Sequence, residues 1–130
     1  MKRDLKKELN FRAPAYPLIT HDPYFSIWSL ADRLNDEPTK HWTGKPHPIC
    51  LLAKVDGKSY RLSGKDPDIN ALTQTKSIVT PTKTIYHFEG AGIEIILEFL
   101  SPVIPTDPLL FSEPSSYIIW HVRATDGANH

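Results

Sequence analysis

The chain has 130 residues, of which 40% are hydrophobic, and it carries 15 basic and 15 acidic side chains. This apolar content suffices for a core and excludes a disordered chain, while no apolar run reaches the roughly 18 residues that a membrane-spanning helix needs. The balanced charge argues against nucleic acid as a partner, because phosphates are bound by an excess of positive potential. The 12 prolines are nearly twice the usual share of about 5%, which favours strands and turns over helices.

Residues 1–11 are predicted to form a charged tail ahead of a domain over residues 12–127. The start MKRDLKKE lacks the apolar stretch that follows the basic end of a signal peptide. Two explanations stay open, a cytoplasmic protein or a chain whose leader was removed or lost. The compartment is therefore left unassigned.

Alternation of apolar and polar residues predicts strands, most clearly over residues 93–99. The apolar face of this segment consists of Ile93, Ile95, Leu97 and Phe99. Residues 84–88 are rich in β-branched and aromatic side chains, and the glycines of residues 89–92 suit a reversal between the two segments. Together they predict a hairpin.

A second hairpin is predicted over residues 49–55 and 58–62, because the intervening Asp56-Gly57 readily adopts the positive φ angles of a type I′ turn. Cys50, the only cysteine, is expected to be a small buried side chain on the first of these strands. It has no second cysteine with which to form an internal disulfide.

Further strands are expected over residues 24–29, 72–79 and 117–124, with Trp28 and Trp120 in the core. About seven strands in roughly 100 residues are typical of an antiparallel β-sandwich, which is the predicted fold. Asp126-Gly127 is again a favoured turn, but only residues 128–130 follow it. We therefore expect the sandwich to be the incomplete front part of a larger one, interrupted at residues 128–130.

One long stretch, residues 30–47, shows no strand pattern and is rich in polar residues. Loops of this length are uncommon in compact domains and are often functional. It also contains Trp42, whose large ring is buried only if the loop folds back or another domain covers it. This stretch is where we expect intermolecular or interdomain contacts.

Three motifs together carry a family resemblance. Residues 12–28 read RAPAYPLITHDPYFSIW, residues 41–44 read HWTG, and residues 55–58 read VDGK. In this order they resemble the amino-terminal region of glutaminase A-like proteins, with the bacterial branch of Bacteroides-type organisms as the nearest match. The resemblance covers residues 11–127.

The resemblance implies that this β-rich region, a domain of unknown function, precedes a helical toroid domain. In such proteins the toroid is expected to hydrolyse glutamine to glutamate and ammonia. The chain would then be a non-catalytic accessory domain with that helical domain as its partner. No cofactor is expected. It also implies export, although the start MKRDLKKE shows no leader.

Residues with catalytic potential occur only singly. Ser26 lacks the glycines of a nucleophile elbow, and Cys50 lacks the electropositive setting of a reactive thiolate. His21, His41 and His47, with Asp22 or Asp36, do not match the spacing of a metal motif. No catalytic or metal-binding residue is therefore assigned.

The residues expected to contact a partner domain or to line the rim of its cleft are Asp22, Tyr24, Asp32, Arg33, Asp36, His41 and Trp42. Asp22-Pro23 also has a purely structural interpretation, in which the carboxylate accepts backbone hydrogen bonds at the start of a turn. The alternative function is an independent module that binds carbohydrate or another small molecule through Trp42 and the neighbouring acidic residues. A self-sufficient small hydrolase is the least favoured interpretation, because no acid, base and nucleophile are placed together.

Overall fold

The structure, a computed structural model, describes residues 12–130, so the predicted tail 1–11 lies outside the described residues. The strands form three sheets in which all paired neighbours are antiparallel. The sheets have the orders β1 (Tyr16–Thr20), β2 (Ser26–Ser29), β3 (Lys40–His41); β4 (Leu51–Val55), β5 (Lys58–Ser63); and β6 (Thr73–Val79), β7 (Lys83–Gly90), β8 (Ile93–Leu100), β9 (Tyr117–Ala124). The predicted all-β, antiparallel fold is confirmed.

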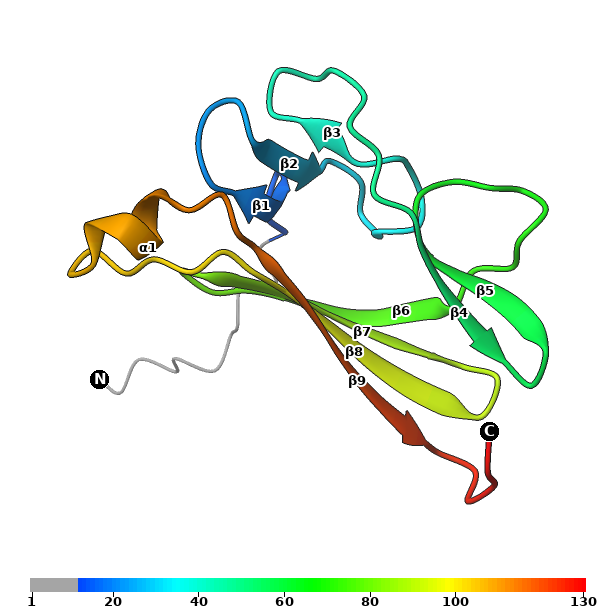
Figure 1. Ribbon diagram of the computed structural model, residues 1–130. Helices are drawn as coiled ribbons and strands as arrows, with labels where there is room; N and C mark the ends of the chain where they lie inside the picture. The colour runs from blue at the N-terminus through cyan, green and yellow to red at the C-terminus, as the bar shows by residue number, and fades with distance from the viewer. Residues whose placement is uncertain (1–11) are drawn as a thin grey trace, which may run out of the picture.

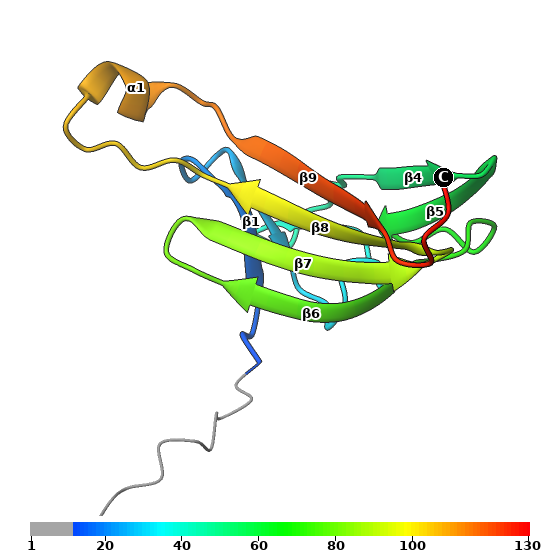
Figure 2. The same ribbon diagram turned by 90° about the horizontal axis from the view of Figure 1, so that it is seen from below.

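The sheets are arranged in two layers (Figure 1). The four-stranded sheet β6–β9 forms one layer, and the two smaller sheets lie over one of its faces, as the view turned by 90° also shows (Figure 2). Strand β1 makes contacts with both β7 and β8 across the layers. The arrangement is sandwich-like, as the spacing of the expected strands predicts.

The core lies between these layers and is built mainly on β7 and β8. Strand β8 alternates between buried and half-buried residues along its whole length, which confirms the predicted apolar face of residues 93–99. Tyr86 and Phe99 stack edge to face, with ring centroids 6.1 Å apart and an interplanar angle of 89°. From the opposite layer and the connecting segments, the core receives Tyr16, Leu18, Leu34, Val55, Leu62 and Leu72.

The turn between β4 and β5 has the predicted type I′ geometry. Asp56 and Gly57 have φ angles of 48° and 79°, both in the left-handed region that this turn requires. The two-residue connection sets the pairing of Val55 with Lys58. The sequence-based prediction of this hairpin is confirmed.

Two predicted core residues are not in the core. Trp28 is half-buried in β2, where its neighbour Ile27 is buried instead. Trp120 lies on the apolar row of β9, but 38% of its surface is exposed, because nothing in residues 12–130 covers that strand. The alternation in β9 correctly indicates a shared face, but a shared face is buried only where a second layer covers it.

Other differences concern short elements. Cys50 lies just before β4 and is exposed, so its predicted burial is wrong. Strand β1, which contains Pro17, and strand β3 were not expected, and β2 begins at Ser26 rather than at residue 24. A five-residue helix, α1 (Pro108–Ser112), is capped by Asp107, whose carboxylate accepts hydrogen bonds from two backbone N–H groups. Among residues 12–130, none of the helical structure has the length and hydrophobicity that a membrane crossing requires.

Candidate functional site

Two turns of the small sheet β1–β3 come together at one end of the molecule. Residues 21–25 connect β1 to β2, and residues 42–45 follow β3. Antiparallel pairing of β2 with β3 sets Ile27 opposite His41 and so brings the second turn beside the first. The three-stranded sheet β1–β3 therefore supports both turns and sets their positions relative to each other.

The first turn is organised by Asp22. Its Oδ1 accepts hydrogen bonds from the backbone N–H groups of Tyr24, at 2.7 Å, and Phe25, at 2.8 Å. These donors, Phe25 first and then Tyr24, lower the pKa of the Asp22 carboxyl below its ordinary value. The structural interpretation of Asp22-Pro23 as the start of a turn is confirmed.

The second turn is closed by backbone hydrogen bonds. The N–H of Gly44 donates to the carbonyl of His41 at 2.8 Å, and the N–H of His41 donates to the carbonyl of Lys45 at 2.9 Å. Gly44 has a φ of 87°, a conformation that residues with a side chain rarely adopt. This tight reversal holds Trp42 and Thr43 at its tip.

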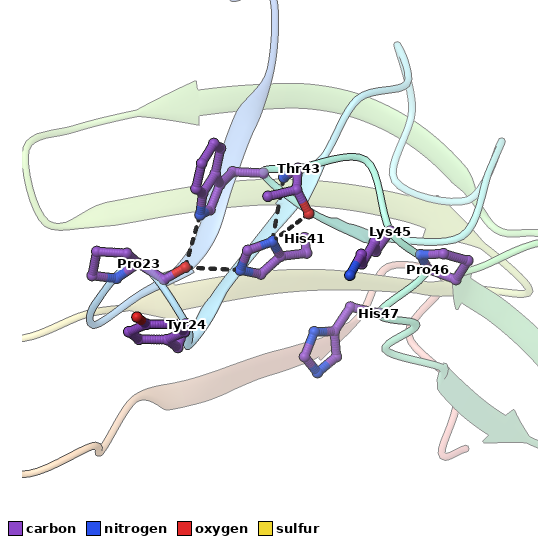
Figure 3. A pocket seen from close by; sticks show the side chains of 8 residues that line it. Pro23, Tyr24, His41, Thr43, Lys45, Pro46 and His47 are labelled. Carbon is purple, nitrogen blue, oxygen red and sulfur yellow. Dashed lines mark hydrogen bonds between the residues drawn. The ribbon is translucent and has the colours of Figure 1, made fainter.

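A single backbone oxygen joins the two turns. The carbonyl of Pro23 accepts one hydrogen bond from Nε2 of His41, at 2.9 Å, and one from Nε1 of Trp42, at 2.8 Å (Figure 3). Because a carbonyl oxygen can only accept, Nε2 of His41 carries a proton. Its Nδ1 then accepts from the backbone N–H and the hydroxyl of Thr43, at 3.3 Å and 2.8 Å. Both ring nitrogens of His41 are thus engaged, and the ring orientation is set.

The two turns enclose a surface hollow of about 500 Å³. Tyr24 and Trp42 stand at this hollow with 90% and 58% of their surface exposed. Such exposure is high for aromatic side chains, which usually bury most of their area. The hollow is lined by Pro23, Tyr24, His41, Trp42, Thr43, Lys45, Pro46 and His47 (Figure 3).

A second hollow of about 370 Å³ adjoins the first. Pro23 and Trp42 line both hollows, so the indole lies between them. Trp28 also lines the second hollow, which accounts for its half-buried state. The surface formed by Asp22, Pro23, Tyr24, His41 and Trp42 is called the paired-turn surface below.

The structure brings together only part of the predicted contact set. Asp22, Tyr24, His41 and Trp42 meet at the paired-turn surface, whereas Asp32, Arg33 and Asp36 line neither hollow. Asp32 forms an ion pair with Arg12, and Asp36 accepts a hydrogen bond from the backbone of Arg33 at 3.2 Å. These three residues stabilise a separate turn.

Several residues that build the site have no recognisable signal in the sequence. Thr43 orients His41, and Lys45 and Pro46 line the first hollow. The acceptor that joins the two turns is the backbone carbonyl of Pro23, and the side-chain types in the sequence do not reveal which carbonyl has this role. Only the Gly44 in a polar stretch signalled a tight turn here.

The arrangement is chemically suited to binding. Within residues 12–130, no group of three histidine, cysteine, aspartate or glutamate side chains is placed to hold a metal ion. Ser26 is buried, and its Oγ accepts a hydrogen bond from Nε1 of Trp28 at 2.8 Å. The hydroxyl of Thr43 donates to Nδ1 of His41, but the same nitrogen also accepts the backbone N–H of Thr43 and the ring is held by the Pro23 carbonyl, so this pair orders the turn. What the site offers is an exposed aromatic surface with fixed polar groups.

Comparisons with known proteins give the family context. Residues 2–75 match a family described as a domain of unknown function, DUF4964, and residues 82–130 match a second, DUF5127. The chain is 29% identical to glutaminase A of Aspergillus oryzae over 127 residues, which cover 92% of the chain and 18% of that protein. It is 28% identical to a probable glutaminase of Arthroderma benhamiae in an alignment 133 residues long, gaps included, that covers 87% of the chain and 15% of that protein. No solved structure matches.

These matches confirm the resemblance to glutaminase A-like proteins. The chain spans less than a fifth of the length of either glutaminase, at 18% and 15%. Both relatives are fungal, so the assignment to a bacterial branch stays a prediction.

Proposed function

The chain belongs to the DUF4964 family, and on that basis we propose that it is a non-catalytic domain of a glutaminase-like amidohydrolase. Its partner is a helical catalytic domain elsewhere in the same polypeptide, which hydrolyses glutamine to glutamate and ammonia. The paired-turn surface contacts that domain near the rim of its cleft. The small share of each glutaminase that the chain spans, 18% and 15%, supports a role as one part of a larger protein.

The observation that carries this proposal is the exposure of Tyr24 and Trp42 on a rigid support. Exposing large apolar rings to water is unfavourable, and aromatic residues are enriched where one protein surface meets another. The bonds to the Pro23 carbonyl hold the indole in place before any contact forms. A pre-ordered aromatic group loses little side-chain entropy on contact, which favours binding.

The test is glutamine hydrolysis by the polypeptide that contains this chain and its catalytic domain. We expect the Trp42→Ala variant to lower kcat/KM for glutamine at least about 5-fold, a coupling of roughly 1 kcal/mol. The exposed Leu52, on β4 away from the site, provides the matched control Leu52→Ala, with unchanged kinetics. Purified residues 1–130 should release no ammonia. Release by this chain, or equal kinetics of both variants, would contradict the proposal.

An independent binding module is the second candidate, favoured by the hollow of about 500 Å³ with two exposed aromatic rings. Flat rings flanked by fixed polar groups suit sugars and other small polar molecules. A glycan array probed with residues 1–130 distinguishes the two. Micromolar binding that Trp42→Ala abolishes and Leu52→Ala preserves would favour the module.

A further inference from the structure

The inner face of β9 breaks the burial pattern of its neighbour. Ile118, Trp120 and Val122 pair in register with Phe99, Leu97 and Ile95 of β8. Paired residues of antiparallel strands project to the same face, so both rows face the core layer. The β8 row is at most 1% exposed, whereas the β9 row is 37%, 38% and 61% exposed in the same order. The core is therefore open along one side.

The backbone of β9 is also uncovered along that side. The sheet order β6-β7-β8-β9 gives β9 one neighbour among the described residues, so its outer row of N–H and C=O groups faces no strand. Over the eight residues Tyr117–Ala124 this is a long edge with exposed apolar side chains. Proteins normally protect such edges with charges, bulges or a covering element, because they pair readily with other strands.

The opposite face of β9 is mixed, with Tyr117 and Ile119 beside His121 and Arg123. Arg123 forms an ion pair with Glu94 of β8 at 2.7 Å, and His121 lies 3.6 Å from Glu98. The largest difference in burial between β8 and β9 therefore lies along the inner apolar row, beside the uncovered strand edge. One occupant satisfies both, a strand that adds to β9 and carries apolar residues at alternate positions toward the core.

We propose that β9 is an internal strand of a larger sheet, and that a further β-strand of the same, longer polypeptide pairs with it and covers Ile118, Trp120 and Val122. The proposal shares with the proposed function the premise that the chain is part of a longer protein, but it concerns a different surface. The relatives favour an occupant from the same polypeptide, because the chain corresponds to 18% and 15% of their lengths.

The test compares residues 1–130 with the longest polypeptide encoded by the same reading frame. Hydrogen exchange of the β9 amides should be at least about 100-fold slower in the longer polypeptide. Val122→Glu should leave residues 1–130 folded with little loss of stability, since that side chain is 61% exposed there. In the longer polypeptide the same substitution should lower the soluble yield several-fold. Leu52→Glu, at 50% exposure on β4, serves as the control and should affect neither.

Three results would overturn the proposal: a reading frame that ends at residue 130, equal exchange of the β9 amides in both proteins, or equal effects of the two variants. A fourth is a dimer of residues 1–130, seen by sedimentation and dissociated by Val122→Glu, with β9 unchanged in the longer polypeptide. That result would assign the surface to a second copy. Failure of the proposed function can be distinguished from failure of this proposal. In the first case the β9 amides would still exchange slowly in the longer polypeptide, although that polypeptide would not hydrolyse glutamine.

Discussion

The two halves of the stretch 30–47 have similar polar composition and opposite roles. In the first half, Leu34 and Asn35 are buried, and Nδ2 of Asn35 donates to the carbonyl of Leu72 at 2.8 Å. In the second half, Trp42 extends from a tight turn with 58% of its surface exposed. The first half therefore fastens the stretch to the core, and the second presents a surface. Polarity alone does not distinguish an anchor from a contact.

The largest expected effect comes from removing an anchor. Leu34 is fully buried in the core, so Leu34→Ala should lower the free energy of unfolding by about 2–5 kcal/mol, measured by urea denaturation. Trp42→Ala is the comparison and should cost less than about 1 kcal/mol, because the ring is mostly exposed. Equal losses in the two variants would remove the distinction between the halves.

The next effect concerns the polar anchor. Asn35→Ala leaves the buried carbonyl of Leu72 without its donor and should cost about 1–3 kcal/mol in the same measurement. Asp36→Ala, one residue further on and exposed, should change stability by no more than about 0.5 kcal/mol. A larger loss for Asp36→Ala would show that the anchoring comes from the exposed side of this turn.

A smaller effect is expected from acid at the paired-turn surface. The folded-state pKa of Asp22 lies below its ordinary value of 3.8, so its stabilising effect on the turn is present above that value. The effect is lost as the pH falls through the folded-state pKa. NMR titration should show the amides of Tyr24 and Phe25 shifting in that acidic range, while the amide of Asn35 stays unchanged. A titration midpoint above 3.8 would contradict the assigned hydrogen bonds.

The smallest effect is expected from Trp42→Phe. This variant removes the indole N–H that donates to Pro23, but His41 still donates to the same carbonyl. The free energy of unfolding should change by less than about 0.5 kcal/mol. Under the proposed function, Trp42→Phe in the longer polypeptide should lower kcat/KM for glutamine less than Trp42→Ala does, which separates the role of ring area from that of the hydrogen bond.

Local sequence patterns predicted the elements that depend on neighbours in the chain. The β4–β5 hairpin follows from the turn chemistry of Asp56-Gly57, and β8 follows from its own alternation. Strand β3 has only two residues and exists through its pairing with β2, so no local pattern marks it. Strand β1 was obscured by Pro17, which an edge strand tolerates.

The candidate site was only partly predictable for the same reason. An aromatic residue in a polar loop identified Trp42, and an Asx turn identified Asp22. Trp42 and Asp22 lie close together because of the register in which β2 pairs with β3, and neither local motif predicts that register. Charge and proximity in sequence suggest a contact role for Asp32, Arg33 and Asp36, but the buried Leu34 between them directs that turn elsewhere.

The double acceptor at Pro23 has a consequence for how this surface tolerates mutation. Every amino acid supplies a main-chain carbonyl, so alanine scanning at position 23 would leave the linking atom in place. An amide-to-ester replacement between residues 23 and 24 would weaken that acceptor, and it would also remove the N–H of Tyr24 that donates to Asp22. Evolutionary drift at position 23 is therefore compatible with a constant link, whereas the donors at His41 and Trp42 have few chemical equivalents.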